Sequence, residues 1–307
     1  MKILDGTLNQ NIHFKWRPDN KWVIRVDPGE QFQVVLPDSS TNQIKSTFTV
    51  EDLKIIDESK FDAATGPVYV NGAVPGDTVE VILDDIEPGD WGWTAILSNF
   101  GLLKGVFKET LVIWDIADGR AQARGGFLRG ISIPVRPFLG VIGCAPSEGE
   151  YGMIPPQHFG GNMDNRLLKK GAQLFLPVQK EGGLISFSDP HAAQGDGEVC
   201  GTAIETSAKA SVRIKLHKDM HIKRPMLISH VEDSGPVLAT MGISNDLYQA
   251  SKDALLDAIN QLKTRGLTGE EAYVLCSVAG NLKISEIVDE PNYVVSLTIP
   301  LTLLEKH

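Results

Sequence analysis

Two short polar clusters, residues 160–164 and 189–198, hold the residue types that can do chemistry in this chain. The second cluster brings three carboxylates and an imidazole together within ten residues: Asp189, His191, Asp196 and Glu198. Such a set can hold a divalent metal ion or transfer protons. Apolar runs at residues 174–178 and 184–187 lie between and around the clusters. This pattern is typical of a β-rich core that opens to solvent, and a function can be argued from it.

The spacing within the second cluster predicts that its side chains face a common point. Pro190 biases Asp189 toward an extended backbone, in which side chains alternate, so Asp189 and His191 point to the same side. The same two-residue spacing relates Asp196 to Glu198. Oxygen ligands with an imidazole suit zinc, manganese or iron, and less often calcium. The alternative is that Asp and Gly only form turns here and that His191 makes ordinary hydrogen bonds.

The first cluster predicts a substrate-binding segment. The paired glycines Gly160 and Gly161 permit positive φ angles and a close approach of the backbone to a ligand. Asn162 can donate a hydrogen bond to an oxyanion, and Asp164 can bind a metal ion or orient a water molecule. The alternative is a surface turn without a ligand.

Composition and charge narrow the class of protein. Hydrophobic residues make up 42% of the 307 residues and charged residues 22%, which is ordinary for a globular domain with a large core. The formal charge of −10 disfavours nucleic-acid binding. No segment reaches the ~18 apolar residues of a membrane span, and the N-terminus lacks a signal-peptide pattern. Three cysteines far apart predict no disulfide framework. We therefore expect a cytoplasmic protein.

The elements that must position these clusters are mostly strands. Alternating apolar and polar residues predict strands at 79–83, 212–216 and 293–299. Residues 23–26 and 32–35 flank a Pro-Gly turn and predict a hairpin. The chain is therefore expected to be mainly β, with a sandwich-like or barrel-like body.

A helical region follows this β-rich body. Apolar residues at three-and-four spacing predict a long helix near residues 245–265, with Asn245 as its N-cap. Thr268 and Glu271 form a capping box that predicts a second helix. We therefore expect a β-rich body at residues 1–225, carrying most of the active site, and an α+β region at residues 226–307. No flexible linker marks the boundary.

Several segments, taken in order and spacing, resemble the acetamidase/formamidase family: residues 65–77, 91–94, 101–103, 140–146, 160–164, 176–178, 189–198, 201–205 and 285–289. The resemblance covers nearly the whole chain. It implies hydrolysis of small amides to ammonia and a carboxylate. It also implies a β-rich α+β fold and assembly into homodimers or larger homo-oligomers.

The resemblance adds two residues from the N-terminal part. His13 and Trp16 resemble the family's His-x-x-Trp element, although Arg17 stands where the family usually has an acid. Asp38 falls where the family carries an aspartate at the end of an early strand. His13 and Asp38 are therefore expected to complete a metal shell built mainly by the second half of the chain.

Amide hydrolysis sets the expected roles. A divalent metal, with zinc preferred over manganese, iron or calcium, would polarise the carbonyl and activate a water molecule. The residues expected to hold it are His13, Asp38, Asp164, Asp189 and His191. Glu198 or Asp196 would take the proton from the water and return it to the departing amine. Asn162 would support the oxyanion. Spacing alone leaves the division of roles among the carboxylates open.

Two alternatives use the same sequence differently. Cys144 could be the nucleophile of a thiol amidase with a nearby glutamate such as Glu148 or Glu150, although a buried cysteine usually acts as a small hydrophobe. The acidic clusters could instead form a metal or sugar site in a non-catalytic β-protein. They lack the Asp-x-Asp-x-Asp-Gly pattern of a helix-loop-helix calcium site.

Overall fold

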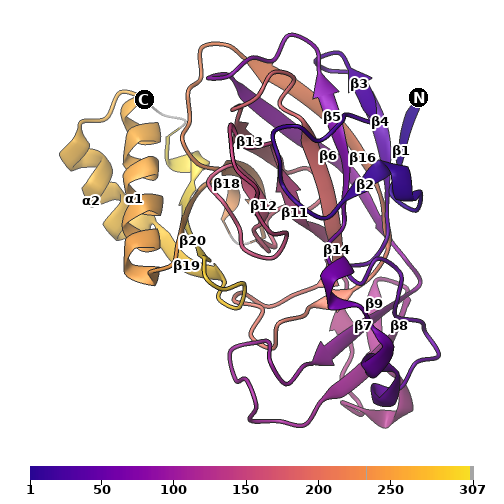
Figure 1. Ribbon diagram of the computed structural model, residues 1–307. Helices are drawn as coiled ribbons and strands as arrows, with labels where there is room; N and C mark the ends of the chain where they lie inside the picture. The colour runs from indigo at the N-terminus through magenta and orange to yellow at the C-terminus, as the bar shows by residue number, and fades with distance from the viewer. Residues whose placement is uncertain (233, 305–307) are drawn as a thin grey trace.

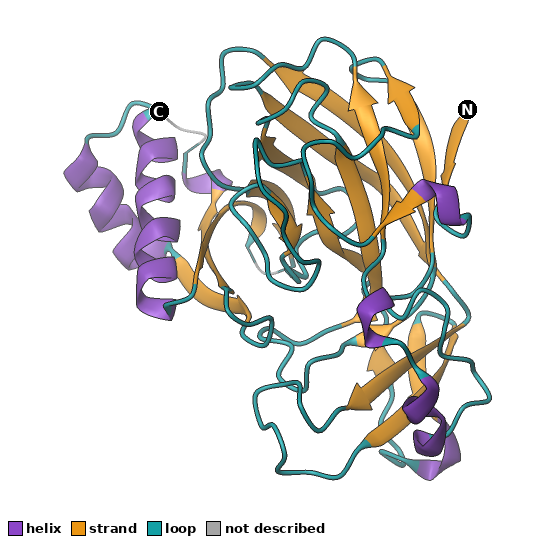
Figure 2. Ribbon diagram, in the orientation of Figure 1, coloured by secondary structure: helices purple, strands orange, loops and turns teal. Residues whose placement is uncertain are grey.

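The computed structural model describes residues 1–232 and 234–304. The chain is mostly strand, with two large sheets and a pair of helices at one side (Figure 1, Figure 2). The prediction of a mainly β fold with an α+β C-terminal part is therefore confirmed. No helix in the described residues is long and apolar enough to cross a membrane.

One sheet has nine strands, in the order β1 (Lys2–Asp5), β4 (Gln31–Leu36), β16 (Ala208–His217), β6 (Thr78–Pro88), β13 (Gln173–Pro177), β17 (Met226–Val231), β18 (Gly235–Ser244), β20 (Tyr293–Pro300) and β19 (Asn281–Glu286). All neighbours are antiparallel except β1 and β4. The strands predicted at 79–83, 212–216 and 293–299 are confirmed as parts of β6, β16 and β20. Because this sheet continues across residue 225, the division there stays a prediction.

The second sheet has eleven strands and carries most of the polar clusters. Its main path is β10 (Ile133–Pro134), β9 (Arg120–Ala123), β8 (Thr110–Ala117), β7 (Trp91–Ile96), β15 (Ile204–Glu205), β14 (Ile185–Ala193), β11 (Phe138–Gly143) and β12 (Gly160–Asn162). Three further strands extend it through β14: β5 (Ala64–Val70), β2 (Ile12–His13) and β3 (Ile24–Val26). Strands β7, β8 and β9 form a lobe below the main body (Figure 1).

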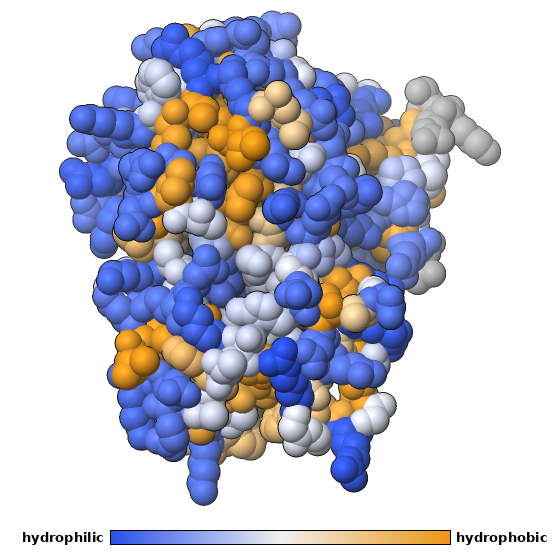
Figure 3. Space-filling view, turned by 90° about the vertical axis from the view of Figure 1, so that its right-hand side faces the viewer, coloured by the Kyte–Doolittle hydropathy of each residue, from blue (hydrophilic) through white to orange (hydrophobic). Residues whose placement is uncertain are grey.

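The two sheets pack face to face around the main core. Phe32 of β4 and Phe187 of β14 meet with ring centroids 6.2 Å apart, and both are fully buried. Val34 and Leu83 from one sheet and Ile142 from the other belong to the same buried cluster. Burial of such side chains is the main stabilising contribution to a sandwich. The face in Figure 3 is mostly hydrophilic, with separate apolar groups.

The hairpin predicted across the Pro-Gly turn is wrong. Strand β3 pairs with β5 in the eleven-stranded sheet, whereas β4 pairs with β1 and β16 in the nine-stranded sheet. The turn exists, and Gly29 adopts a φ of 88° there. It leads the chain from one sheet into the other. The sequence of a turn therefore did not reveal which strands pair on either side of it.

The helices match their predicted positions. Helix α1 (Leu247–Lys263) packs on β18 and β20, and α2 (Gly269–Ala279) packs against α1. The N-cap of α1 is Asp246, whose carboxylate accepts from the Gln249 amide at 2.7 Å, so the prediction of Asn245 is wrong by one residue. Thr268 and Glu271 form the predicted capping box. Short 3₁₀ helices are η1 (Asn9–Asn11), η2 (Val50–Ile55), η3 (Glu58–Lys60), η4 (Arg124–Gly126) and η5 (Leu301–Leu303).

Candidate active site

A small cavity of about 180 Å³ brings the two polar clusters together. Its polar lining includes Asp62, Asn162, Asp164, Asp189, His191, Glu198, Glu205 and Asp289. Strand β14 supplies two of these residues, and β12 and β15 supply one each, while the others stand on loops beside β5, β12, β14 and β19. Ligand pockets commonly measure about 300–1,000 Å³, so this cavity suits a small molecule.

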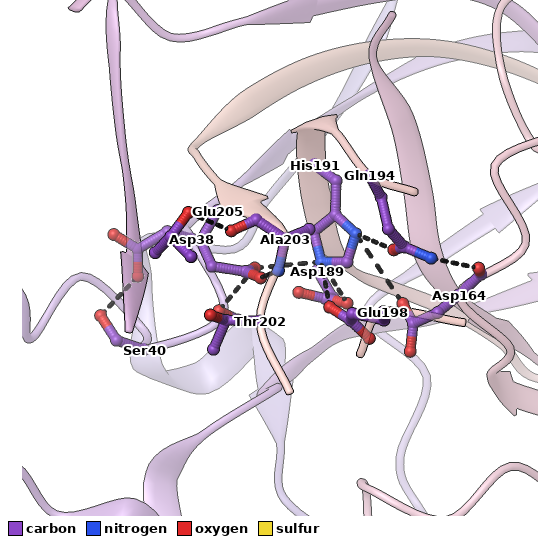
Figure 4. A network of polar contacts seen from close by, with 12 residues as sticks. Asp38, Ser40, Asp164, Asp189, His191, Gln194, Glu198, Thr202, Ala203 and Glu205 are labelled. Atoms are coloured by element: carbon purple, nitrogen blue, oxygen red, sulfur yellow. Dashed lines mark hydrogen bonds and ion pairs between the residues drawn. The ribbon is translucent and has the colours of Figure 1, made fainter. Parts of the chain in front are cut away.

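The imidazole of His191 is the centre of the site (Figure 4). Its Nε2 atom lies 2.9 Å from Oδ2 of Asp189 and 3.0 Å from Oε2 of Glu205. The same nitrogen lies 4.0 Å from Oε1 of Glu198, and Nδ1 lies 3.9 Å from Oδ1 of Asp164. Two sets of potential metal ligands share this ring: Asp189 with Glu205, and Asp164 with Glu198.

Gln194 fixes the orientation of the His191 ring. The Gln194 side chain donates from Nε2 to the backbone carbonyl of Asp164 at 2.8 Å, so its Oε1 faces Nδ1 of His191 at 2.9 Å. Since that oxygen only accepts, Nδ1 carries a proton and Nε2 is directed at the carboxylates. Phe138 supports the ring edge-to-face, with centroids 5.0 Å apart. This arrangement is typical of a histidine held ready for a metal ion.

The cavity is strongly acidic. Among the described residues that line it there is no Lys or Arg. Burial raises the pKa of Asp62, Asp189 and Glu198 well above the usual range, and repulsion from neighbouring carboxylates adds to this. Burial opposes a charge on His191, yet Asp189 and Glu205 raise its pKa well above the ordinary value. The site therefore favours positive charge, whether carried by a proton or by a metal ion.

Four of the cavity carboxylates stand on left-handed backbone. The φ angles are 54° at Asp62, 40° at Asp164, 55° at Asp189 and 47° at Glu198. This region is uncommon for residues other than glycine and costs about 1–3 kcal/mol for each residue held there. Such strain persists where the surrounding structure imposes it, and it occurs preferentially at functional sites.

Gly140 of β11 allows two of these acids to approach each other. A Cβ atom at this position would lie 2.2 Å from Oδ1 of Asp164 and 2.3 Å from Oδ2 of Asp189. Both distances are far shorter than a normal contact. The absence of a side chain at Gly140 therefore makes room for one carboxylate from each cluster.

The comparisons with known proteins identify the family of this chain. The model of the acetamidase/formamidase family matches residues 5–151 and 150–306. The chain belongs to this family. The formamidase of Methylophilus methylotrophus is 28% identical to it, over 96% of this chain and 89% of that protein. The expectation of an amidase that acts on carbon–nitrogen bonds other than peptide bonds is thereby confirmed.

Solved structures support the same fold. A predicted acetamidase/formamidase from Thermoanaerobacter tengcongensis is 31% identical, with a TM-score of 0.90 over 99% of this chain and 97% of that one. An acetamidase from Bacillus halodurans is 29% identical, with a TM-score of 0.89 over 99% of both chains. The non-catalytic reading of the clusters has no support from these relatives.

Two of the expected site residues, His13 and Asp196, lie outside this cavity. The His13 ring is bonded to Ser186 Oγ at 2.8 Å and to the Lys15 carbonyl at 2.9 Å, and burial lowers its pKa to about 4. Both ring nitrogens are therefore already occupied. Asp196 is exposed and forms a bidentate ion pair with Arg166, at 2.7 and 2.9 Å. Neither residue lines the cavity.

Asp38 lies next to the cavity rather than in its wall. Its carboxylate accepts from the Ser40 hydroxyl at 2.5 Å and from the Asn42 amide at 3.1 Å. The adjacent Ser39 donates to Oε2 of Glu205 at 2.8 Å (Figure 4 shows Asp38 beside Glu205). Asp38 therefore shapes the turn that supports Glu205.

Gly160 and Gly161 serve packing in the structure. They belong to β12 and pair with β11. A Cβ at Gly160 would lie 2.4 Å from the Ile142 carbonyl oxygen, and Gly161 has a φ of 96° beside the Trp16 ring. Neither lines the cavity, and their close packing positions Asn162, which does.

Sequence spacing missed Glu205, Asp62 and Asp289. Glu205 lies directly opposite His191 on the neighbouring strand, although fourteen positions separate them in the chain. The sequence feature that could have indicated Glu205 is its position directly after the apolar residues 203–204. Asp289 follows a similar run at residues 287–288, and its carboxylate accepts from Nδ2 of Asn162 at 2.8 Å. Only the tertiary fold brings these acids to one place.

The loop that carries Glu198 is attached to the C-terminal region. The Gly197 amide donates to the Ser285 carbonyl at 2.9 Å, and Gly197 forms a parallel bridge with Glu286. Glu286 accepts in turn from the amide of Asp289 at 2.6 Å. One side of the cavity is therefore held in place by residues near the end of the chain.

Cys144 does not lie in the cavity. It is fully buried in the main core, and burial raises the pKa of its thiol well above the ordinary value. A buried neutral thiol is a weak nucleophile. The thiol-enzyme alternative therefore has no geometric support.

Replacing Cys144 with alanine is expected to leave most of the amidase activity intact. The substitution removes one buried sulfur and costs about 1–2 kcal/mol of stability, by analogy with other large-to-small changes. Ammonia release from acetamide, with a thermal melt as the control for folding, measures both effects. A folded variant that had lost all activity would instead point to a nucleophilic thiol.

Proposed function

We propose that this amidase hydrolyses small linear amides, of the formamide or acetamide type, to ammonia and a carboxylate in the His191 cavity, with a bound divalent cation and with zinc preferred. One observation carries the proposal: six carboxylates, at most 7% exposed, surround a single histidine without a compensating Lys or Arg among the described lining residues. Buried charges of one sign need cations or protons to balance them.

The ligand set that fits best is His191 with Asp189 and Glu205. Zinc bonds of about 2.0–2.2 Å place neighbouring donors about 3–3.5 Å apart. The separations of 2.9 and 3.0 Å from Nε2 of His191 agree with this. When bound, such a cation polarises a carbonyl group and makes a water molecule more acidic. Asp164 is a further candidate ligand, because both of its oxygens are buried without a hydrogen-bond partner.

Glu198 is our candidate for the proton-transferring residue. Its Oε1 lies 4.0 Å from Nε2 of His191, and burial together with repulsion from Asp164 raises its pKa, which favours its role as a proton donor to the leaving amine. Glu198 takes a proton from water as the oxygen forms a bond to the carbonyl carbon. It returns that proton to the amide nitrogen as the carbon–nitrogen bond breaks. Ammonia leaves together with a carboxylic acid, which becomes the carboxylate when it releases its proton to ammonia or water at neutral pH.

The rest of the cavity wall supports a small acyl group. Five large apolar or aromatic side chains also line the cavity: Phe61, Trp93, Leu97, Phe100 and Ile154. Gly201 packs against Phe100, because a Cβ at Gly201 would lie 2.5 Å from that ring. The apolar side chains can enclose the acyl end of a substrate while the carboxylates face its reacting end.

Removal of the divalent cation is expected to abolish amide hydrolysis, because the buried acids then balance their charges with protons. Protein dialysed against a chelator should release no ammonia from formamide or acetamide, and addition of one equivalent of zinc should restore the activity. Elemental analysis and ammonia release are measured on the same samples. Unchanged turnover after complete removal of the cation would contradict the proposed role of the carboxylates.

We also propose that the protein forms homo-oligomers in the cytoplasm, as dimers or larger assemblies. Strand β19 ends the nine-stranded sheet, and apolar side chains stand exposed on it and on α2: Tyr273, Val274, Val278 and Leu282. An exposed edge with an apolar surface suits contact with a second chain. The three cysteines are free thiols, which agrees with a reducing compartment.

A further inference from the structure

Four buried polar atoms in the cavity wall have no hydrogen-bond partner. Among the described residues, they are Nε1 of Trp93, Oδ1 of Asn162 and both carboxylate oxygens of Asp164. Buried polar groups in folded proteins almost always find a partner, so each such exception needs an explanation. The Asp164 oxygens are accounted for by the proposed cation, but an indole N–H and an amide oxygen are not.

The orientation of Asn162 is fixed by its neighbour Asp289. Nδ2 of Asn162 donates to Oδ2 of Asp289 at 2.8 Å, and the asparagine is only 4% exposed. The carboxylate takes up the donor side of the amide, which leaves Oδ1 as the free atom. Asn162 therefore offers an acceptor to the cavity, whereas the sequence had suggested a donor to an oxyanion.

Trp93, on strand β7, supplies a hydrogen-bond donor to the cavity wall. It is directly paired with Glu205 across β7 and β15, so both side chains stand on the same face of the sheet. The indole is 1% exposed and lines the cavity beside Phe61, with ring centroids 6.3 Å apart. An indole N–H can only donate. Its natural partner in this position is an acceptor on a bound molecule.

We propose that Trp93 and Asn162 together recognise the primary amide group of the substrate, an inference that rests on the proposed function. The carbonyl oxygen of an amide accepts from Nε1 of Trp93, and an amide N–H donates to Oδ1 of Asn162. The product carboxylate has no N–H, and its oxygen is repelled by Oδ1 of Asn162. The same residue therefore favours binding of the amide and release of the acid.

This pairing predicts discrimination between amides and esters. A site built to hydrogen-bond an N–H group rejects an analogue that lacks it by about 10⁴–10⁵. Methyl acetate keeps the carbonyl oxygen of acetamide but has no N–H. The wild-type enzyme should therefore prefer acetamide strongly, after correction for the different intrinsic reactivities of the two compounds.

The test compares kcat/KM for acetamide and methyl acetate in four proteins: wild type, Asn162→Ala, Asn162→Asp and Trp93→Phe. Asn162→Ala should lower the amide value about 10²-fold and leave the ester value within about threefold. Asn162→Asp keeps an acceptor oxygen, so it should retain the amide preference even if both values fall. Trp93→Phe should lower both values about 10-fold or more, since both substrates carry the carbonyl oxygen.

Asn165→Ala is the matched control, because this nearby buried asparagine has partners for both polar atoms, Ser296 and the Leu167 amide. It should leave the amide-to-ester ratio unchanged. An equal loss for amide and ester in Asn162→Ala, or an unchanged ratio, would overturn the proposal. Failure of the wild-type enzyme to release ammonia from acetamide would instead refute the proposed function. Cation content, measured in each variant, separates loss of recognition from loss of the metal site.

Discussion

Replacing Glu198 with glutamine is expected to lower kcat for acetamide by about 10³, because a positioned proton-transferring group contributes about 10²–10⁴ to the rate. Glutamine has nearly the same size and can fill the same space, but it cannot carry the proton from water to the leaving amine. KM should change much less than kcat. Steady-state ammonia release at saturating substrate measures the effect.

The same substitution is expected to raise the thermal stability of the cation-free protein. Glu198 is buried, and burial followed by repulsion from Asp164 raises its pKa well above the ordinary 4.5. A folded state that holds the proton more tightly than the unfolded state loses stability as the pH rises above 4.5 and toward the raised value. Glutamine has no such penalty, so the gain should appear in thermal melts above about pH 4.5 and grow with pH.

Asp196→Asn provides the comparison, because Asp196 stands two residues away and faces Arg166 instead of the cavity. It should keep activity within about threefold of wild type, as expected for a surface ion pair worth about 0–1 kcal/mol. The opposite result, an inactive Asp196→Asn with an active Glu198→Gln, would exchange the two roles and restore one of the sequence-based alternatives.

Gly140→Ala is expected to abolish both cation binding and activity. Its Cβ would lie 2.2 Å from Asp164 and 2.3 Å from Asp189, so at least one carboxylate must move by about 1 Å. A displacement of about 1 Å at a catalytic site can cost about 10² in rate, and here two groups are affected at once. We expect at least that loss in kcat/KM, together with a low cation content by elemental analysis.

Gly152→Ala is the matched control for the change of Gly140. A Cβ at Gly152 would meet only Pro155, at an ordinary distance of 3.7 Å. This variant should bind the cation and hydrolyse acetamide at the wild-type rate. Full cation occupancy in a folded Gly140→Ala protein would show that Asp164 and Asp189 do not need their observed spacing.

Much of the fold could be predicted from local patterns. The alternation of apolar and polar residues in β6, β16 and β20, and the three-and-four spacing of apolar residues in α1, are local sequence patterns. The structure confirms these elements. The predicted hairpin of β3 and β4 was wrong because the two strands belong to different sheets: β3 pairs with β5, and β4 pairs with β16. Local sequence favours a strand but does not choose its neighbour.

The candidate site divides in the same way. His191, Asp189 and Glu198 were found because they lie close together in the chain, and the fold leaves them close together in space. Asp196 has the same spacing as Glu198 but turns outward, because Arg166 offers it an ion pair. Glu205 could not be singled out without knowing that β15 lies beside β14. Proximity in the sequence pointed to a set of candidate residues, and the tertiary structure shows which of them face the cavity.

The attachment of the Glu198 loop to Ser285 and the place of Asp289 in the cavity wall have a consequence during biosynthesis. A nascent chain that has reached only the helical pair still lacks the last wall of the pocket, so the proposed cation site is incomplete until the final strands leave the ribosome. Loss of the residues from 285 onward would remove β20 from the nine-stranded sheet as well as Asp289 from the cavity wall. The cavity wall is therefore complete only when the C-terminal residues are in place.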